Sequence, residues 1–357
     1  MKKNKIILLL LVCSLFAPAS ILAIPASKGI EHKSMELTIE PKMIPYKELD
    51  SAIKKTVEQA INHYADGKRV KLETAIKMEI FRGKNKAEGW RIENKDRSAV
   101  INVDAASGKV IDLSLLLTMS EMKGKYKKQL EAANAVVKQV KAEAVFTGER
   151  VDFSINEWRN RQSITFITKD EQSIELDLKT CKPSYYSFKF KASNVDGKIM
   201  RTAEQAVKCL RDGKFASFTY IRRNSQSKGV VDIWEFKRKV EIKRADIAKY
   251  EHVEIGENGN KAYAIESQVY IDGKTGKLFS ADVSPKTHNQ KQVQLTQEQA
   301  VEIAIPAAQK MFGKDLSTYK VKVSSSKKVY TFSSKGEESI LARFDKYGNL
   351  ISMQRLV

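Results

Sequence analysis

Apolar and polar positions along the chain follow two different periods. In several stretches the apolar residues recur three and four positions apart, which is the spacing of a helix with one buried face. Shorter stretches between them, rich in β-branched and aromatic residues and bounded by turn residues, are typical of strands. The pattern predicts helices within Lys47–Lys68, Tyr126–Phe146, Arg201–Leu210 and Leu295–Phe312. In the first unit it predicts strands at Leu72–Phe81, Trp90–Glu93, Ser98–Asp104 and Lys109–Leu113.

Helix ends are marked by capping residues. Thr202 with Gln205, and Thr296 with Gln299, have the three-residue spacing of a capping box, so we expect each threonine to be an N-cap. Pro306 should kink the last helix or end its regular hydrogen bonding, because proline has no N–H.

A turn pattern recurs four times after the predicted strands. In each version an Asp begins the turn, and in three of them a Gly ends it. Asp can bond its own backbone to start a turn, and Gly supplies the positive φ that closes a hairpin. The pattern predicts structural turns at Asp104 with Gly108, Asp177 with Cys181, Asp272 with Gly276, and Asp345 with Gly348. The alternative, calcium ligation by these Asp residues, needs several oxygen ligands at close spacing, and none of the turns has them.

One large aromatic residue precedes each turn. Trp90, Trp158, Trp234 and Tyr330 each begin or continue a strand pattern. We interpret these rings as the largest core side chains of four units, in preference to a row of binding residues. The predicted fold class is therefore α+β: tandem units, each a helix packed on a small antiparallel β-sheet. The predicted boundaries are 1–23 for a signal peptide, 24–45 for a linker, 46–118 for unit 1, 119–190 for a divergent unit 2, 191–285 for unit 3 with an insertion, and 286–357 for unit 4.

The N-terminus has the layout of a secretory signal peptide. Lys2, Lys3 and Lys5 precede an apolar run that is too short to span a bilayer, and small residues follow it. Cleavage could follow Ala19 or Ala23. Lipidation of Cys13 is an alternative, but Val precedes this Cys where a small residue is preferred. We expect the mature protein to be secreted or associated with the cell envelope.

Charge and cysteine content add two expectations. Loss of the three N-terminal lysines would lower the formal charge from +20 to +17, which would attract the protein to anionic polymers or membrane surfaces. The basic residues are interleaved with acids, however, which also fits an ordinary solvated surface. Cys181 and Cys209 could form a disulfide in an oxidising compartment, closing a loop of about 28 residues.

The turns and helix starts resemble those of PepSY-like modules, specifically the YcdB/YcdC-type repeated domain of bacterial cell envelopes. The resemblance rests on Thr-x-Glu-Gln-Ala-Val at Thr202 and Thr296, on the aromatic strands, and on the hairpins around Asp104 and Asp272. It implies a helix against a small antiparallel sheet and the binding or restraint of peptidases, and it supplies no catalytic residues. Cys181 and the long third unit depart from the pattern, so the four units need not bind alike.

Recognisable catalytic motifs are missing from the sequence. The four histidines, His32, His63, His252 and His288, form no HExxH motif and no pair at metal spacing, so we predict no metal or cofactor. There is no GxSxG elbow, and the stretch at Asp272 fits a hairpin better than a phosphate loop. Arg222, Arg223 and Lys228 could contact phosphates, but no stacking aromatics are interleaved, so no nucleic-acid partner is expected.

Three functions follow in order of preference. The first is an exported, non-catalytic module that binds or restrains a secreted peptidase, taking an extended peptide on a sheet edge or on the face opposite the helices. The second is a basic structural protein held by anionic cell-wall polymers. The third, an exported hydrolase, is disfavoured by the few histidines.

Overall fold

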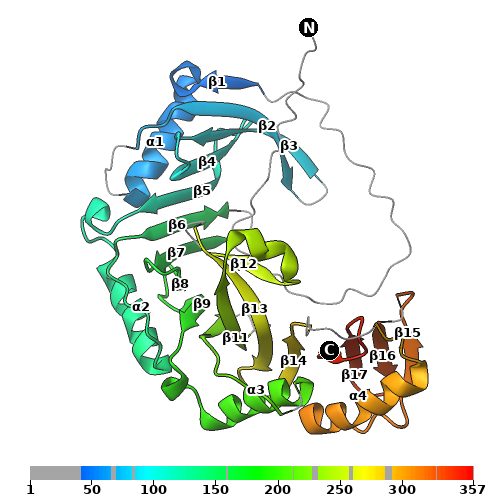
Figure 1. Ribbon diagram of the computed structural model, residues 1–357. Helices are drawn as coiled ribbons and strands as arrows, with labels where there is room; N and C mark the ends of the chain where they lie inside the picture. The colour runs from blue at the N-terminus through cyan, green and yellow to red at the C-terminus, as the bar shows by residue number, and fades with distance from the viewer. Residues whose placement is uncertain are drawn as a thin grey trace. The chain divides into compact units, whose positions relative to one another are not determined.

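The computed structural model describes residues 42–65, 70–82, 85–157, 160–211, 213–226, 232–256, 260–285, 292–326 and 328–356 (Figure 1). All of them fall within one compact unit, Ile39–Val357. Among these residues the α-helices are α1 (Ser51–Ala65), α2 (Lys127–Val140), α3 (Gly197–Leu210) and α4 (Gln297–Phe312).

A group of strands follows each helix. The first group is β2 (Thr74–Arg82), β3 (Asn85–Glu93), β4 (Ala99–Asp104) and β5 (Val110–Leu117), with β1 (Met43–Pro45) before α1. The second is β6 (Val151–Asn156), β7 (Arg161–Ile167), β8 (Ser173–Asp177) and β9 (Pro183–Lys189). The third is β10 (Tyr220–Gln226), β11 (Asp232–Ile242), β12 (Val253–Ile255), β13 (Ala262–Asp272) and β14 (Leu278–Val283). The last is β15 (Lys320–Val323), β16 (Val329–Ser333), β17 (Ser339–Phe344) and β18 (Leu350–Leu356).

The predicted fold class of tandem units with separate small sheets was wrong. All 18 described strands belong to one continuous antiparallel sheet. Strand β5 pairs with β6, β9 pairs with β10, and β14 pairs with β18, so each group is joined to the next through main-chain hydrogen bonds. The physical reason is that a strand at the end of a small sheet leaves N–H and C=O groups unpaired, and pairing with the neighbouring group satisfies them.

The direction of joining changes at the last group. In the first two joins, the last strand of one group pairs with the first strand of the next. In the third join, β14 pairs with β18, which is the last strand of its own group. The first strand of that group, β15, is thereby placed at the end of the sheet, where it pairs with β16 alone among the described strands.

One face of the sheet carries the hydrophobic core. Strands β4 and β6 alternate buried and partly buried residues, as expected for a sheet with one packed face. Cross-strand partners carry this buried face through the joins, for example Leu115 opposite Phe153 and Ala281 opposite Met353. Helices α1 to α4 lie on this face (Figure 1), and most of the buried apolar residues form one connected cluster. We call the other side of the sheet the open face.

Local structure at the helix ends agrees with the sequence expectations only in part. Thr202 is not an N-cap: α3 begins at Gly197, five residues earlier, because the Asp196 carboxylate accepts hydrogen bonds from the N–H groups of Lys198 and Ile199. The Thr202 hydroxyl instead donates to the Lys198 carbonyl inside the helix. Thr296 does cap α4, with the complete capping box to Gln299. Helix α4 continues through Pro306 to Phe312, so Pro306 does not end the helix.

Candidate binding edge of the sheet

Strands β1 and β15 form the two ends of the strand order. Among the described strands, β1 pairs only with β2, and β15 pairs only with β16. A strand at an edge offers N–H and C=O groups along its outer side, and these can pair with another chain. The two edges differ in how much of that hydrogen-bonding capacity they present.

The β1 edge is weakened by a proline. The N–H of Lys77 donates to the carbonyl of Lys42, and the N–H of Tyr46 donates to that of Glu73, so the residues between them alternate in direction. Met43 and Pro45 therefore turn their main chain away from β2. Since Pro45 has no N–H, this edge offers a single outward donor, at Met43.

The β15 edge keeps both of its outward donors. The N–H of Ser324 donates to the carbonyl of Val329 at 2.9 Å, and Lys322 is opposite Thr331 in the same register. By the alternation of an antiparallel ladder, Lys320 and Lys322 direct their main chain towards β16. Val321 and Val323 direct theirs outward, and both retain an N–H.

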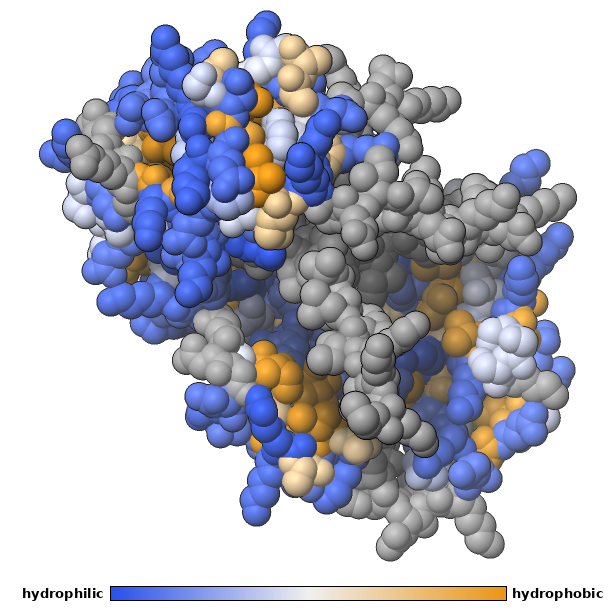
Figure 2. All heavy atoms as spheres, turned by 90° about the horizontal axis from the view of Figure 1, so that it is seen from above, coloured by the Kyte–Doolittle hydropathy of each residue, from blue (hydrophilic) through white to orange (hydrophobic). Residues whose placement is uncertain are grey.

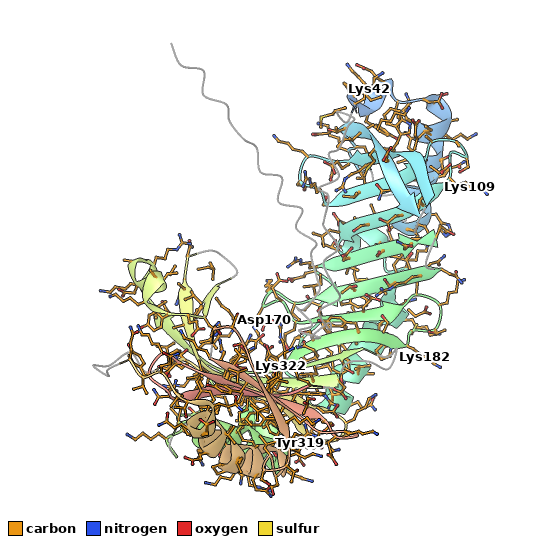
Figure 3. The ribbon with its side chains drawn as sticks, turned by 90° about the vertical axis from the view of Figure 1, so that its right-hand side faces the viewer. Lys42, Lys109, Asp170, Lys182, Tyr319 and Lys322 are labelled. Atoms are coloured by element: carbon orange, nitrogen blue, oxygen red, sulfur yellow. The ribbon has the colours of Figure 1, made fainter. Side chains whose placement is uncertain are left out.

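The side chains of β15 alternate between the two faces of the sheet. Val321 and Val323 pack against the core on the buried face, whereas Lys320 and Lys322 are exposed on the open face. Lys322 and Tyr319, three residues before it, are labelled in Figure 3. No ion pair between described residues includes either lysine; the nearest pair in sequence joins Lys314 to Glu337. The sequence analysis did not predict this strand, although Lys-Val-Lys-Val alternates polar and apolar residues with the period of two of a half-buried strand.

In the other three groups, the first strand after the helix, which corresponds to β15, has another strand on its outer side. These first strands are β2, β6 and β10, and they pair antiparallel with β1, β5 and β9, respectively. Three of four first strands therefore receive an antiparallel strand on their outer side. Strand β15 is the one first strand among the described residues without such a partner.

A charged network occupies the open face over β11 and β13. The Lys237 ammonium lies 2.6 Å from a carboxylate oxygen of Glu235 and 2.6 Å from one of Glu254, which comes from β12. Burial by itself lowers the pKa of Lys237, but the two carboxylates outweigh it and raise this pKa. Tyr270 donates to Glu235 at 3.2 Å, and burial raises the pKa of this phenol. Lys239 also pairs with Glu254, so these ion pairs hold β12 against β11.

The turn residues lie at the ends of hairpins. Asp104 accepts hydrogen bonds from the N–H and hydroxyl of Ser107, and Gly108 has φ +64°. Asp272 accepts the same two bonds from Thr275, and Gly276 has φ +69°.

The other two turns use the same chemistry with different closing residues. Asp177 accepts bonds from Thr180, and Cys181 takes the Gly position at φ +57°. Asp345 accepts bonds from the N–H groups of Tyr347 and Asn349, and Gly348 has φ +80°. None of these carboxylates belongs to a group of three or more metal-ligating side chains within the described residues.

The remaining candidate residues are not brought together. Cys181 and Cys209 are both free thiols. Cys209 borders a cavity of about 440 Å³ between α3 and α4, where burial raises the pKa of its thiol and Lys310 opposes this effect. His63 and His252 are exposed, whereas His32, His288, Cys13, Trp158 and Lys228 lie outside the described residues.

The two adjacent arginines are already engaged by protein groups. Arg223 pairs with Asp232 at 2.8 Å and lies over the Trp234 ring. Arg222 donates to the Glu171 carbonyl at 3.0 Å. Neither guanidinium is arranged as a free phosphate clamp.

Comparisons with known proteins add no assignment. No family model matches the chain, and neither the curated proteins nor the solved structures give a match. Within the described part of the chain, no helix is both long and apolar enough to cross a membrane. The functional proposal below therefore rests on the geometry of the sheet edge.

Proposed function

We propose that the chain is an exported, non-catalytic binding module that restrains a secreted peptidase by receiving an extended segment of it on the edge of β15. Addition of a strand to an exposed sheet edge is a common way to bind extended peptides, with main-chain hydrogen bonds supplying affinity. The observation that carries the proposal is the pair of outward N–H groups on Val321 and Val323, on the one first strand that has no strand on its outer side among the described residues.

The test uses two matched proline substitutions in the mature chain that begins at Ser20. Val321→Pro removes an outward N–H of β15 and leaves the hydrogen bonds to β16 in place. Met43→Pro removes the corresponding outward N–H of β1 at the other edge. Purified peptidases from the medium of the producing cell are assayed for hydrolysis with increasing amounts of each protein.

Wild type and Met43→Pro should slow the same peptidase, and Val321→Pro should not. Equal inhibition by all three proteins would exclude the β15 edge as the site. If wild type slows no co-exported peptidase, the proposal of a restraining module is wrong.

A second candidate function, retention by anionic cell-wall polymer, is favoured by the lysines of three turns. Strands β4, β8 and β13 are four strands apart in the ladder and run in the same direction, so their following turns lie at the same end of the strands. Each turn ends in an exposed lysine, Lys109, Lys182 or Lys277, about 19 Å apart across the ladder. Figure 3 shows Lys109 and Lys182 along this side of the sheet.

Salt separates the second function from the first. Charge-mediated retention of the mature chain on wall preparations should be lost at about 1 M salt, where the Debye length is about 3 Å. A triple Lys→Gln variant at Lys109, Lys182 and Lys277 should bind wall preparations more weakly, while Lys261→Gln, which changes one exposed charge elsewhere, should not. Retention unchanged by salt would contradict this function.

A further inference from the structure

We infer that the segment bound by β15 runs antiparallel to it and alternates apolar with acidic side chains. This inference rests on the proposed function, because it assumes that the β15 edge receives a strand. It adds the chemistry by which one segment is chosen over another.

The direction follows from the other groups of the sheet. Where β5 lies along β6 and β9 lies along β10, the added strand is antiparallel to the first strand of its group. A strand placed on β15 in the same way forms its hydrogen-bonded pairs with Val321 and Val323, whose N–H and C=O point outward.

The apolar positions follow from the buried face. Residues opposite Val321 and Val323 project on the same side as these valines, next to the core. The covered edges show what fills such positions: Leu113 lies opposite Ile155, and Leu115 lies opposite Phe153. Apolar side chains in the bound segment would continue the same packing.

The acidic positions follow from the two lysines. Residues between the apolar ones project on the open face beside Lys320 and Lys322, which are both exposed. On β16 their partners are Ser333 and Thr331, which carry no charge. Opposite charges on facing strands attract and like charges repel, so acidic residues fit these positions and basic residues do not.

The same charges argue against a second copy of this chain as the occupant. If β15 paired with its counterpart in one of the two antiparallel registers that place Val321 opposite Val321 or Val323 of the second copy, Lys320 would face Lys322 of the second copy, or Lys322 would face Lys322. Like charges directly opposite each other destabilise a pair of strands. The charge pattern therefore favours a partner that carries carboxylates. Hydrophilic side chains cover much of the surface visible in Figure 2.

The experiment measures binding of three fluorescent peptides to the mature chain by anisotropy. Each peptide has a central stretch in which Val alternates with Glu, with Thr or with Lys, and all have the same polar ends. At low salt the Val/Glu peptide should bind about tenfold more tightly than the Val/Thr peptide, and the Val/Lys peptide should bind most weakly. The double variant K320E/K322E should reverse the order, and Val321→Pro should abolish binding of all three, while Met43→Pro should match wild type.

Failure of this inference and failure of the proposed function give different results. If the three peptides bind equally and Val321→Pro abolishes their binding, the edge is the site but the acidic preference is wrong. If none binds, or if Val321→Pro binds them as wild type does, the edge itself is wrong as the site. Self-association of the chain in sedimentation, abolished by Val321→Pro, would overturn the choice of a partner in favour of a second copy.

Discussion

Cys181 occupies a backbone position that a glycine would fill with less strain. In the four turns, the residue at this place has positive φ, and in three of them it is glycine. Cys181 has φ +57°, a conformation that costs an L-residue about 1–2 kcal/mol. Replacement by Gly removes this strain but increases the entropy of the unfolded chain, which offsets about 0.5–1 kcal/mol. Cys181→Gly should therefore raise the free energy of unfolding by about 0–1.5 kcal/mol.

The converse substitution, at Gly276, tests the same balance between backbone strain and the entropy of the unfolded chain. An added Cβ at Gly276 would meet no atom within 4 Å, so Gly276→Ala should lower stability through backbone strain alone, by about 1 kcal/mol. Cys181→Ala is the control, since it removes the thiol and keeps the strain, and it should leave stability nearly unchanged. Urea denaturation followed by circular dichroism measures all three variants. A fall in stability for Cys181→Gly would refute the reasoning.

Three further predictions concern stability. Lys237→Met leaves Glu235 and Glu254 without the cation they share, and it should lower the free energy of unfolding by about 3 kcal/mol in urea denaturation. The control, Lys261→Met, removes one partner of an exposed ion pair and should leave the free energy of unfolding almost unchanged. Thr296→Ala removes a capping box and should lower the free energy of unfolding by about 1 kcal/mol, whereas Thr202→Ala, inside α3, should not. Burial raises the pKa of Asp152 in the folded chain above its value of about 4 in the unfolded chain. Protonation of Asp152 therefore stabilises the fold at pH values below about 4, and this stabilisation is lost as the pH rises through the pKa of the folded chain. The stability of Asp152→Asn relative to wild type should therefore rise as the pH increases above about 4 in thermal melts, and a constant difference would contradict this assignment.

Local features could be read from the sequence because their causes are local. The Asp and Gly residues of the turns bond or bend their own backbone, and the box at Thr296 needs only residues three apart. The start of α3 was misread because two candidate caps compete: Asp196 satisfies the first N–H groups, so Thr202 lies inside the helix.

The continuous sheet and its open edge could not be predicted in the same way. Main-chain pairing between β5 and β6 or between β9 and β10 uses groups that every residue has, so side-chain patterns do not distinguish it from a free edge. Whether β15 or β18 pairs with β14 decides which strand is exposed, and the pairing of β14 with β18 joins segments far apart in the sequence. The period-two pattern of β15 was visible, but its position at the end of the sheet depends on this long-range choice.

The most direct test of the binding edge is hydrogen exchange at single amides, followed by NMR with and without the Val/Glu peptide. In the free chain, the N–H groups of Val321 and Val323 should exchange rapidly, while that of Lys322, which faces β16, should be protected. Saturation with the peptide should protect Val321 and Val323 and leave Met43 unchanged. Rapid exchange at both valines while the peptide is bound would contradict the account.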